Sequence, residues 1–99
     1  MTSSAIDVGV PDAVDVTTSE DTLTVELGDG RSLSVPLTRY PRLLHATLAE
    51  RANWRLIGRG QGMHWPDIEE DVSVESLLAG RRSGEGSASL ARWLQQRQA

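Results

Sequence analysis

A regular alternation of apolar and polar residues on both sides of a glycine-flanked turn is the feature that most constrains the fold of this chain. From Thr22 to Leu27 every second side chain is leucine or valine, and after Gly28-Asp29-Gly30 the alternation resumes up to Pro36. Such alternation places one side of a strand against a core and the other in water. Glycine supplies the positive φ angles that a tight turn needs. The pattern predicts an antiparallel hairpin, preceded by a strand over 13–17 and a polar turn at 19–21.

Signals for short helices follow the hairpin. Proline is favourable at a first helical position, as at Pro41, and Thr47 and Glu50 have the spacing of a capping box. We therefore expect two short helical segments, over 41–46 and 48–53. Ser73 and Gly80 stand where the N-cap and the C′ residue of a further short helix would be.

The remaining strands are expected on either side of a glycine-rich turn. Residues 54–58 read as a fourth strand and 63–65 as a short fifth one, with Gly58, Gly60 and Gly62 between them. A phosphate-binding loop is the sharper interpretation of these glycines. However, the dinucleotide-binding pattern needs another spacing and a helix that follows, so a hairpin turn is favoured.

The expected organisation is a single α+β domain, with a small, mainly antiparallel sheet of hairpins packed against short helices and a C-terminal helix. We expect a flexible tail over 1–12, the domain over 13–80, a Gly/Ser-rich linker over 81–87 and the helix over 88–99. The strand faces and the first helix predict a core, which consists of Leu23, Val25, Leu33, Val35, Leu43, Trp54 and Leu56.

Composition excludes several classes of function. The chain has no cysteine, which excludes disulfides and thiol catalysis. All 10 basic residues are arginine and the net charge is −4, a poor balance for general nucleic-acid binding. No apolar run is long enough to span a bilayer, and the first ten residues lack the features of a signal peptide. The expectation is a cytoplasmic protein without a membrane partner.

His64 and the acidic residues after it form the one suggestive chemical cluster. Asp67, Glu69, Glu70 and Asp71 follow this histidine closely in sequence. A metal site needs several ligands that converge with fixed geometry, and one histidine with an acidic loop is weak support for one. We therefore expect no catalytic, cofactor-binding or metal-binding residues, and no enzyme.

Several stretches together resemble a known family. They are Asp-Gly-Arg at 29–31, Tyr-Pro-Arg-Leu-Leu at 40–44, Glu-Arg-Ala-Asn-Trp-Arg-Leu-Ile-Gly at 50–58, His-Trp-Pro-Asp at 64–67 and Asp-Val-Ser-Val-Glu-Ser-Leu-Leu-Ala-Gly at 71–80. In this order, over roughly residues 12–84, the chain resembles the Domain of Unknown Function 2442 family. The resemblance implies a small bacterial α+β protein, often encoded beside a second small protein, the pair being proposed as toxin and antitoxin. It implies no catalytic residues.

The resemblance therefore favours a non-enzymatic protein-binding module, the antitoxin-like member of a bacterial two-gene system, that binds and occludes a cognate protein or a second copy. The alternative is a nucleic-acid-associated regulatory or defence-system accessory protein with an arginine-rich face. The candidate partner-binding residues are Arg39, Arg42, Arg51, Arg55, Arg59, Leu90, Trp93 and Leu94.

The sequence leaves open the role of the arginines and the packing of the terminal helix. The arginines, of which Arg42 and Arg51 are expected on the outer side of the short helices, form either a binding face or a solvated face paired with Glu50 or Asp67. The apolar stripe of the terminal helix, with Trp93 at its centre, packs either on its own domain or on another chain.

Overall fold

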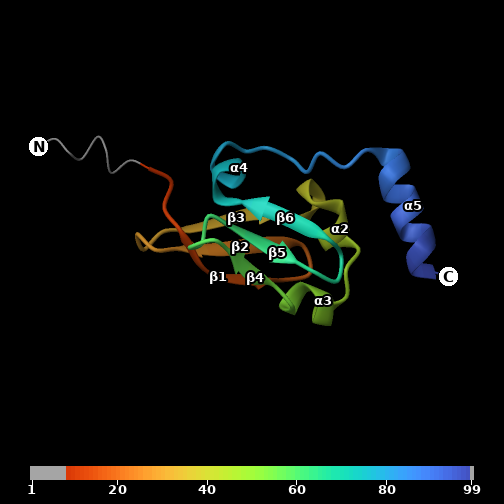
Figure 1. Ribbon diagram of the computed structural model, residues 1–99, viewed down its shortest axis with the longest axis horizontal. Coiled ribbons are helices and arrows are strands. Elements are labelled where there is room, and N and C mark those ends of the chain that lie inside the picture. The colour runs from red at the N-terminus through yellow and green to blue at the C-terminus, as the bar shows by residue number, and fades with distance from the viewer. Residues whose placement is uncertain (1–8, 99) are drawn as a thin grey trace, which may run out of the picture.

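The computed structural model describes residues 9–98 and shows two three-stranded antiparallel sheets with short helices around them (Figure 1). Residues 1–8, most of the predicted tail, lie outside the described residues, as does Ala99. The α+β prediction is confirmed, although the strands form two sheets rather than one. The elements are β1 Ala13–Thr18, β2 Thr22–Leu27, β3 Ser32–Pro36, η1 Leu37–Arg39, α2 Pro41–Leu44, α3 Leu48–Ala52, β4 Arg55–Ile57, β5 Gly62–Trp65, β6 Glu70–Ser73, α4 Val74–Leu78 and α5 Ser87–Gln98.

The first sheet, in the order β1-β2-β3, contains the predicted hairpin. Leu23 pairs with Val35 and Val25 pairs with Leu33, so the apolar positions of β2 and β3 share one face. In the turn, Gly30 has a φ of 94°, and the Asp29 carboxylate accepts a hydrogen bond from the backbone N–H of Arg31 at 3.0 Å. The turn residues thus set the register that the alternation requires.

The second sheet, in the order β4-β5-β6, packs against the first through one shared core. Its central strand contributes Met63 and Trp65, which are both fully buried. They join Leu23, Val25 and Leu27 of β2 in that core. The two central strands therefore supply much of the buried surface, since each has a neighbour on both sides.

The helix signals in the sequence are confirmed by hydrogen bonds. The Glu50 N–H donates to Thr47 Oγ1 at 3.1 Å and the Thr47 N–H donates to Glu50 Oε1 at 2.8 Å, which completes the capping box of α3. The Ser73 side chain caps α4 in the same way. At the end of α4, Gly80 has a φ of 72°, and the N–H groups of Gly80 and Arg81 bond back to the carbonyls of Leu77 and Ser76. This is a Schellman motif.

The predicted core is correct for its centre and wrong at one edge. Leu23, Val25 and Leu43 are fully buried, whereas Leu33, Val35 and Trp54 are partly buried and pack against the core. Leu56 is 38% exposed. It lies opposite the buried Met63 in the β4–β5 pair and so faces the core side. Because β4 is the edge strand of the second sheet, however, Leu56 has no strand beyond it to complete its cover.

Helix α5 lies at one end of the molecule, beyond α2 and α3, and an extended segment joins it to α4 (Figure 1). The helices in the described part of the chain include none with the length and apolar character to cross a membrane.

Candidate partner-binding surfaces

The five candidate arginines do not form one face, because Arg51 lies in the interior. Only 7% of this residue is exposed, so the expectation that it points to solvent is wrong. Its guanidinium group donates hydrogen bonds to the backbone carbonyls of Leu43 at 2.9 Å, Leu44 at 2.8 Å and Ser19 at 3.2 Å. The last carbonyls of a helix lack partners within that helix, and Arg51 supplies donors to those of α2.

Arg39 and Arg42 hold the segment between α4 and α5. Arg39 Nη1 donates to the carbonyl of Gly80 at 2.8 Å. Arg42 makes an ion pair with Glu85 and also donates to the carbonyl of Ile68 at 2.9 Å. The Arg42 guanidinium, followed by the Ser89 hydroxyl, lowers the pKa of the Glu85 carboxyl. Both arginines are therefore occupied by contacts within the chain.

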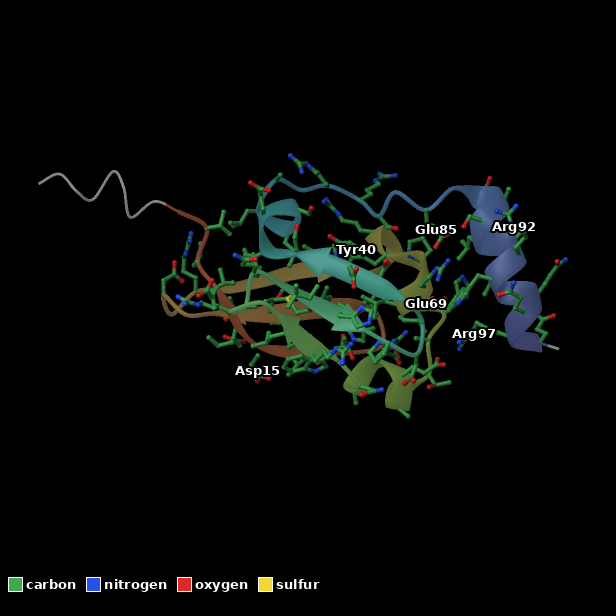
Figure 2. All side chains as sticks on the ribbon, in the orientation of Figure 1. Asp15, Tyr40, Glu69, Glu85, Arg92 and Arg97 are labelled. Atoms are coloured by element: carbon green, nitrogen blue, oxygen red, sulfur yellow. The ribbon has the colours of Figure 1, made fainter. Side chains whose placement is uncertain are left out.

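Helix α5 packs on its own chain through a clasp that we define by Arg42, Glu50, Glu85, Trp93 and Arg97. Two guanidinium groups lie over the Trp93 ring, with the Arg42 Cζ 5.1 Å and the Arg97 Cζ 4.6 Å from its centroid. Arg97 makes two hydrogen bonds to the Glu50 carboxylate, at 2.7 and 2.9 Å, and lies on the side of α5 that faces the sheets (Figure 2). This contact lowers the Glu50 pKa to about 2.

The apolar stripe of α5 is consequently covered in this structure. Trp93 is 8% exposed, and Leu90 and Leu94 are partly buried against the core. Of the two arrangements left open by the sequence, the structure shows the one in which the stripe packs on its own domain.

Strand β4 is the part of the second sheet that remains open. All three of its residues are exposed, Leu56 to 38% and Ile57 to 39%, and Arg55 precedes them. Arg59, in the turn that follows, is also exposed. Within residues 9–98, neither Arg55 nor Arg59 takes part in an ion pair. These two are therefore the candidate arginines that remain accessible for a partner.

His64 has one acidic neighbour rather than a cluster. Its Nδ1 shares a hydrogen bond with the Asp71 carboxylate, which lies opposite it in the β5–β6 pair. Asp67 accepts a hydrogen bond from Asn53 instead, and Glu69 occupies a turn with a φ of 52°. Across residues 9–98 no three His, Asp or Glu side chains converge as a metal site would require. The pair can orient the imidazole, but no hydroxyl group within this part of the chain hydrogen-bonds to it.

The Glu70 side chain turns inward, since it lies opposite the buried Trp65 in the β5–β6 pair. Its Oε2 is buried without a hydrogen-bond partner in the described part of the chain. Burial raises the pKa of this carboxyl. Burial and then the nearby Glu70 charge raise the pKa of the Tyr40 hydroxyl. The hydroxyl donates to the Arg81 carbonyl at 3.3 Å.

The glycine-rich turn joins β4 to β5 as a hairpin, as the sequence predicts, and it also brings backbone segments close together. Gly58 and Gly60 have φ angles of 61° and 104°. A Cβ at Gly60 would lie 2.4 Å from the Ala13 carbonyl oxygen, and one at Gly62 would lie 2.7 Å from that of Val72. The Ala13 N–H also donates to the Gly60 carbonyl at 2.7 Å. Glycine is required here because backbones approach each other closely.

Sequence reasoning missed two acidic members of the clasp and one arginine. Arg97 follows Trp93 by four residues, a helical spacing that could have indicated the stacking of the two side chains. The sequence predicts Glu50 in the capping box, where the structure places it, and its carboxylate also forms an ion pair with Arg97. Glu85 lies in a Gly/Ser-rich segment whose composition carries no signal for an ion pair.

The fold of the described residues defines a class of protein, a small α+β domain of two antiparallel three-stranded sheets. The chain belongs to the family described as "Protein of unknown function (DUF2442)", whose model matches residues 13–83. Helix α5 lies beyond the matched residues.

Comparison with solved structures supports the same fold. A crystal structure of a protein of unknown function from Rhodospirillum rubrum ATCC 11170 matches with a TM-score of 0.66 and 24% sequence identity. The match covers 83% of this chain and 99% of that one. No curated protein matches the chain at a significant level.

Proposed function

We propose that this protein is a non-enzymatic binding module for a partner protein and acts as the antitoxin-like member of a bacterial two-gene pair. It occludes the partner by covering a functional surface. The observation that carries the proposal is the exposure of β4 along its whole length, with Leu56 and Ile57 between Arg55 and Arg59. Interfaces are enriched in arginine and in apolar side chains at their centres, and this edge combines both.

The nucleic-acid alternative is less well supported by the positions of the arginines. Phosphate contacts need several positive charges on one accessible face. Arg51 is buried, and Arg42 is neutralised by Glu85. Two accessible arginines on β4 and its turn make a small positive site on a chain with a net charge of −4. A protein partner with local acidic groups fits this site better.

The test is co-expression with the protein encoded next to this one, followed by size-exclusion chromatography with light scattering. We expect a stoichiometric complex. The double variant Leu56→Ser/Ile57→Ser should weaken the complex by about 100-fold, since two apolar contacts at an interface centre are lost.

The matched control is Leu78→Ser, which changes a leucine of similar exposure, 42%, on α4. This variant should bind the partner like the unchanged protein. If the neighbouring protein forms no complex, or if Leu78→Ser weakens the complex as much as the β4 double variant does, the proposed function of this edge is wrong.

A further inference from the structure

The second sheet ends at a strand whose outer backbone edge is open. Among the described residues β4 is paired with β5 alone. Leu56, on the core side, and Ile57, on the outer side, are 38% and 39% exposed, so both faces of this strand are only partly covered. An open edge presents unpaired N–H and C=O groups that can pair with a further strand.

The other edge strands carry features that prevent such pairing. In β1 the register with β2 shifts between Ala13 and Asp15, so the strand has an irregularity there, and the Ala13 N–H is already bound to Gly60. Bulges and irregularities block edge pairing. On the opposite side of the molecule β3 ends in Pro36, which has no N–H to donate. Helix α4 packs beside both β3 and β6 (Figure 1).

The outer face of the second sheet carries a row of polar side chains, formed by Arg55, His64 and Asp71. In the strand register, Arg55 of β4 lies opposite His64 of β5, and His64 lies opposite Asp71 of β6. Asp71 binds His64, which leaves Arg55 at the open end of the row without an ion pair in the described residues. Opposite charges on directly paired strand positions stabilise a sheet, and like charges destabilise it.

We propose that the partner adds a strand alongside β4 and extends the second sheet, with a carboxylate opposite Arg55 and an apolar residue opposite Leu56. This inference rests on the proposed function and specifies how the partner is held. Backbone hydrogen bonds to β4 provide the general affinity of strand addition, and the side chains provide the selectivity. The carboxylate completes the row acid–Arg55–His64–Asp71.

Charge complementarity favours a different protein over a second copy of this chain. In an antiparallel pairing of two β4 strands centred on Leu56, each Arg55 lies opposite an Ile57 and finds no carboxylate. In a parallel in-register pairing the two arginines lie side by side and repel each other. The occupant that satisfies Arg55 is therefore an acidic strand from another protein.

The shortness of β4 accounts for selectivity. Three residues form few backbone hydrogen bonds, so pairing with an arbitrary strand is weak, and short charged edge strands are a known protection against aggregation. A strand with the matching carboxylate gains the ion pair in addition, while the apolar residue opposite Leu56 covers its exposed surface.

The test uses the isotopically labelled full chain and two short synthetic peptides, one alternating valine with glutamate and the other alternating valine with lysine. The readout is the backbone amide signals of residues 55–57 in NMR titrations. We expect the glutamate peptide to shift these signals and to bind about tenfold more tightly than the lysine peptide. In Arg55→Glu the preference should reverse, and in Arg55→Gln it should disappear.

Equal binding of the two peptides, or no change in the 55–57 signals at millimolar peptide, overturns strand addition. Signals of residues 55–57 that shift with protein concentration alone also overturn the proposal, because they indicate that β4 pairs with a second copy of this chain. If the neighbouring gene product forms a complex but the amide signals of residues 55–57 do not change, the proposed function stands and strand addition is wrong. If the peptides bind according to charge but that complex does not form, strand addition stands and the proposed function is wrong.

Discussion

The guanidinium group of Arg51 joins three segments of the chain by donating to carbonyls of α2 and of the turn between β1 and β2. The backbone carbonyl of the same residue accepts a hydrogen bond from the Trp65 indole N–H at 3.0 Å. One residue thus connects α3 to the first sheet, to α2 and to the centre of the core. Its planar fork of donors suits several carbonyls at once, which a lysine ammonium could not match in geometry.

Replacement of this residue should be costly. Arg51→Ala leaves three carbonyls without their donor, and we expect the free energy of unfolding in urea to fall by about 2–4 kcal/mol. Arg51→Lys should recover only part of that loss. The control is Arg59→Ala, at an exposed arginine, which should change stability by less than about 0.5 kcal/mol. Equal effects of the two alanine variants would contradict the interior role of Arg51.

The difference between Arg51 and the exposed arginines could not be predicted from the sequence. The sequence predicts Arg51 at the end of a short helix and Arg55 in the strand that follows, and the structure confirms both elements. Neither local sequence distinguishes a buried arginine from an exposed one. Whether an arginine meets orphan carbonyls or solvent depends on how α2 and the β1–β2 turn come together, and local sequence does not encode this.

At the scale of an element, contacts with charged side chains hold both ends of helix α5. Its first turn reaches Glu85 through the Ser89 hydroxyl, and its last turn reaches Glu50 through Arg97, with Trp93 between. Both glutamates have lowered pKa values, Glu50 to about 2. A lowered carboxyl pKa contributes stability above the ordinary value of 4.5 and loses it as pH falls toward the folded-state value.

Docking of α5 should accordingly persist from neutral pH to pH 4.5 and weaken between pH 4.5 and about 2. The measurement is the NMR signal of the Trp93 indole N–H during acidification. In Arg97→Ala the loss should begin at higher pH, because Glu50 no longer has its partner. Gln96→Ala changes an exposed, uncharged residue of the same helix and should leave the midpoint nearly unchanged. An Arg97→Ala titration identical to that of the unchanged protein would contradict this assignment.

Elements with local signals were predictable and those without were not. The β2–β3 hairpin, the Thr47 capping box and the Ser73 and Gly80 ends of α4 each depend on residues close in sequence, and the structure confirms them. Strand β6 was missed. Its sequence, Glu-Asp-Val-Ser, is poor in strand-forming residues, and it is extended because β5 pairs with it.

For the whole molecule, the chain from Ala13 to Leu77 forms a body that contains every buried core residue of the described part except Trp93. Deletion of residues 87–99 should therefore leave a protein that unfolds cooperatively and keeps its strand signal in circular dichroism. Its stability should fall by on the order of 3 kcal/mol, the cost of removing one large buried aromatic side chain.

The full-length variant Trp93→Ala is the comparison for this truncation and should lose a similar amount of stability. A truncated chain without a cooperative transition would show that α5 is required for the body to fold.

The global arrangement was only partly predictable. The α+β class follows from patterns within single elements, whereas the division of the strands into two sheets depends on which pairs form at long range. The open edge at β4 follows from that division, so Leu56 was expected in the core although nothing lies beyond it. Of the candidate surface, the accessible Arg55 and Arg59 agree with the expectation of exposed arginines, and Arg51 does not.

The contact between Ala13 and Gly60 has a consequence for synthesis on the ribosome, which delivers the chain from its N-terminus. The first sheet can pair once Pro36 has emerged, but the Ala13 N–H waits for a carbonyl that is translated 47 residues later. Until β5 arrives, the apolar face formed by Leu23, Val25 and Leu27 lacks Met63 and Trp65, the buried side chains of the second sheet's central strand. The nascent chain therefore exposes an aggregation-prone apolar surface during the middle of translation, and this exposure ends when the second sheet forms.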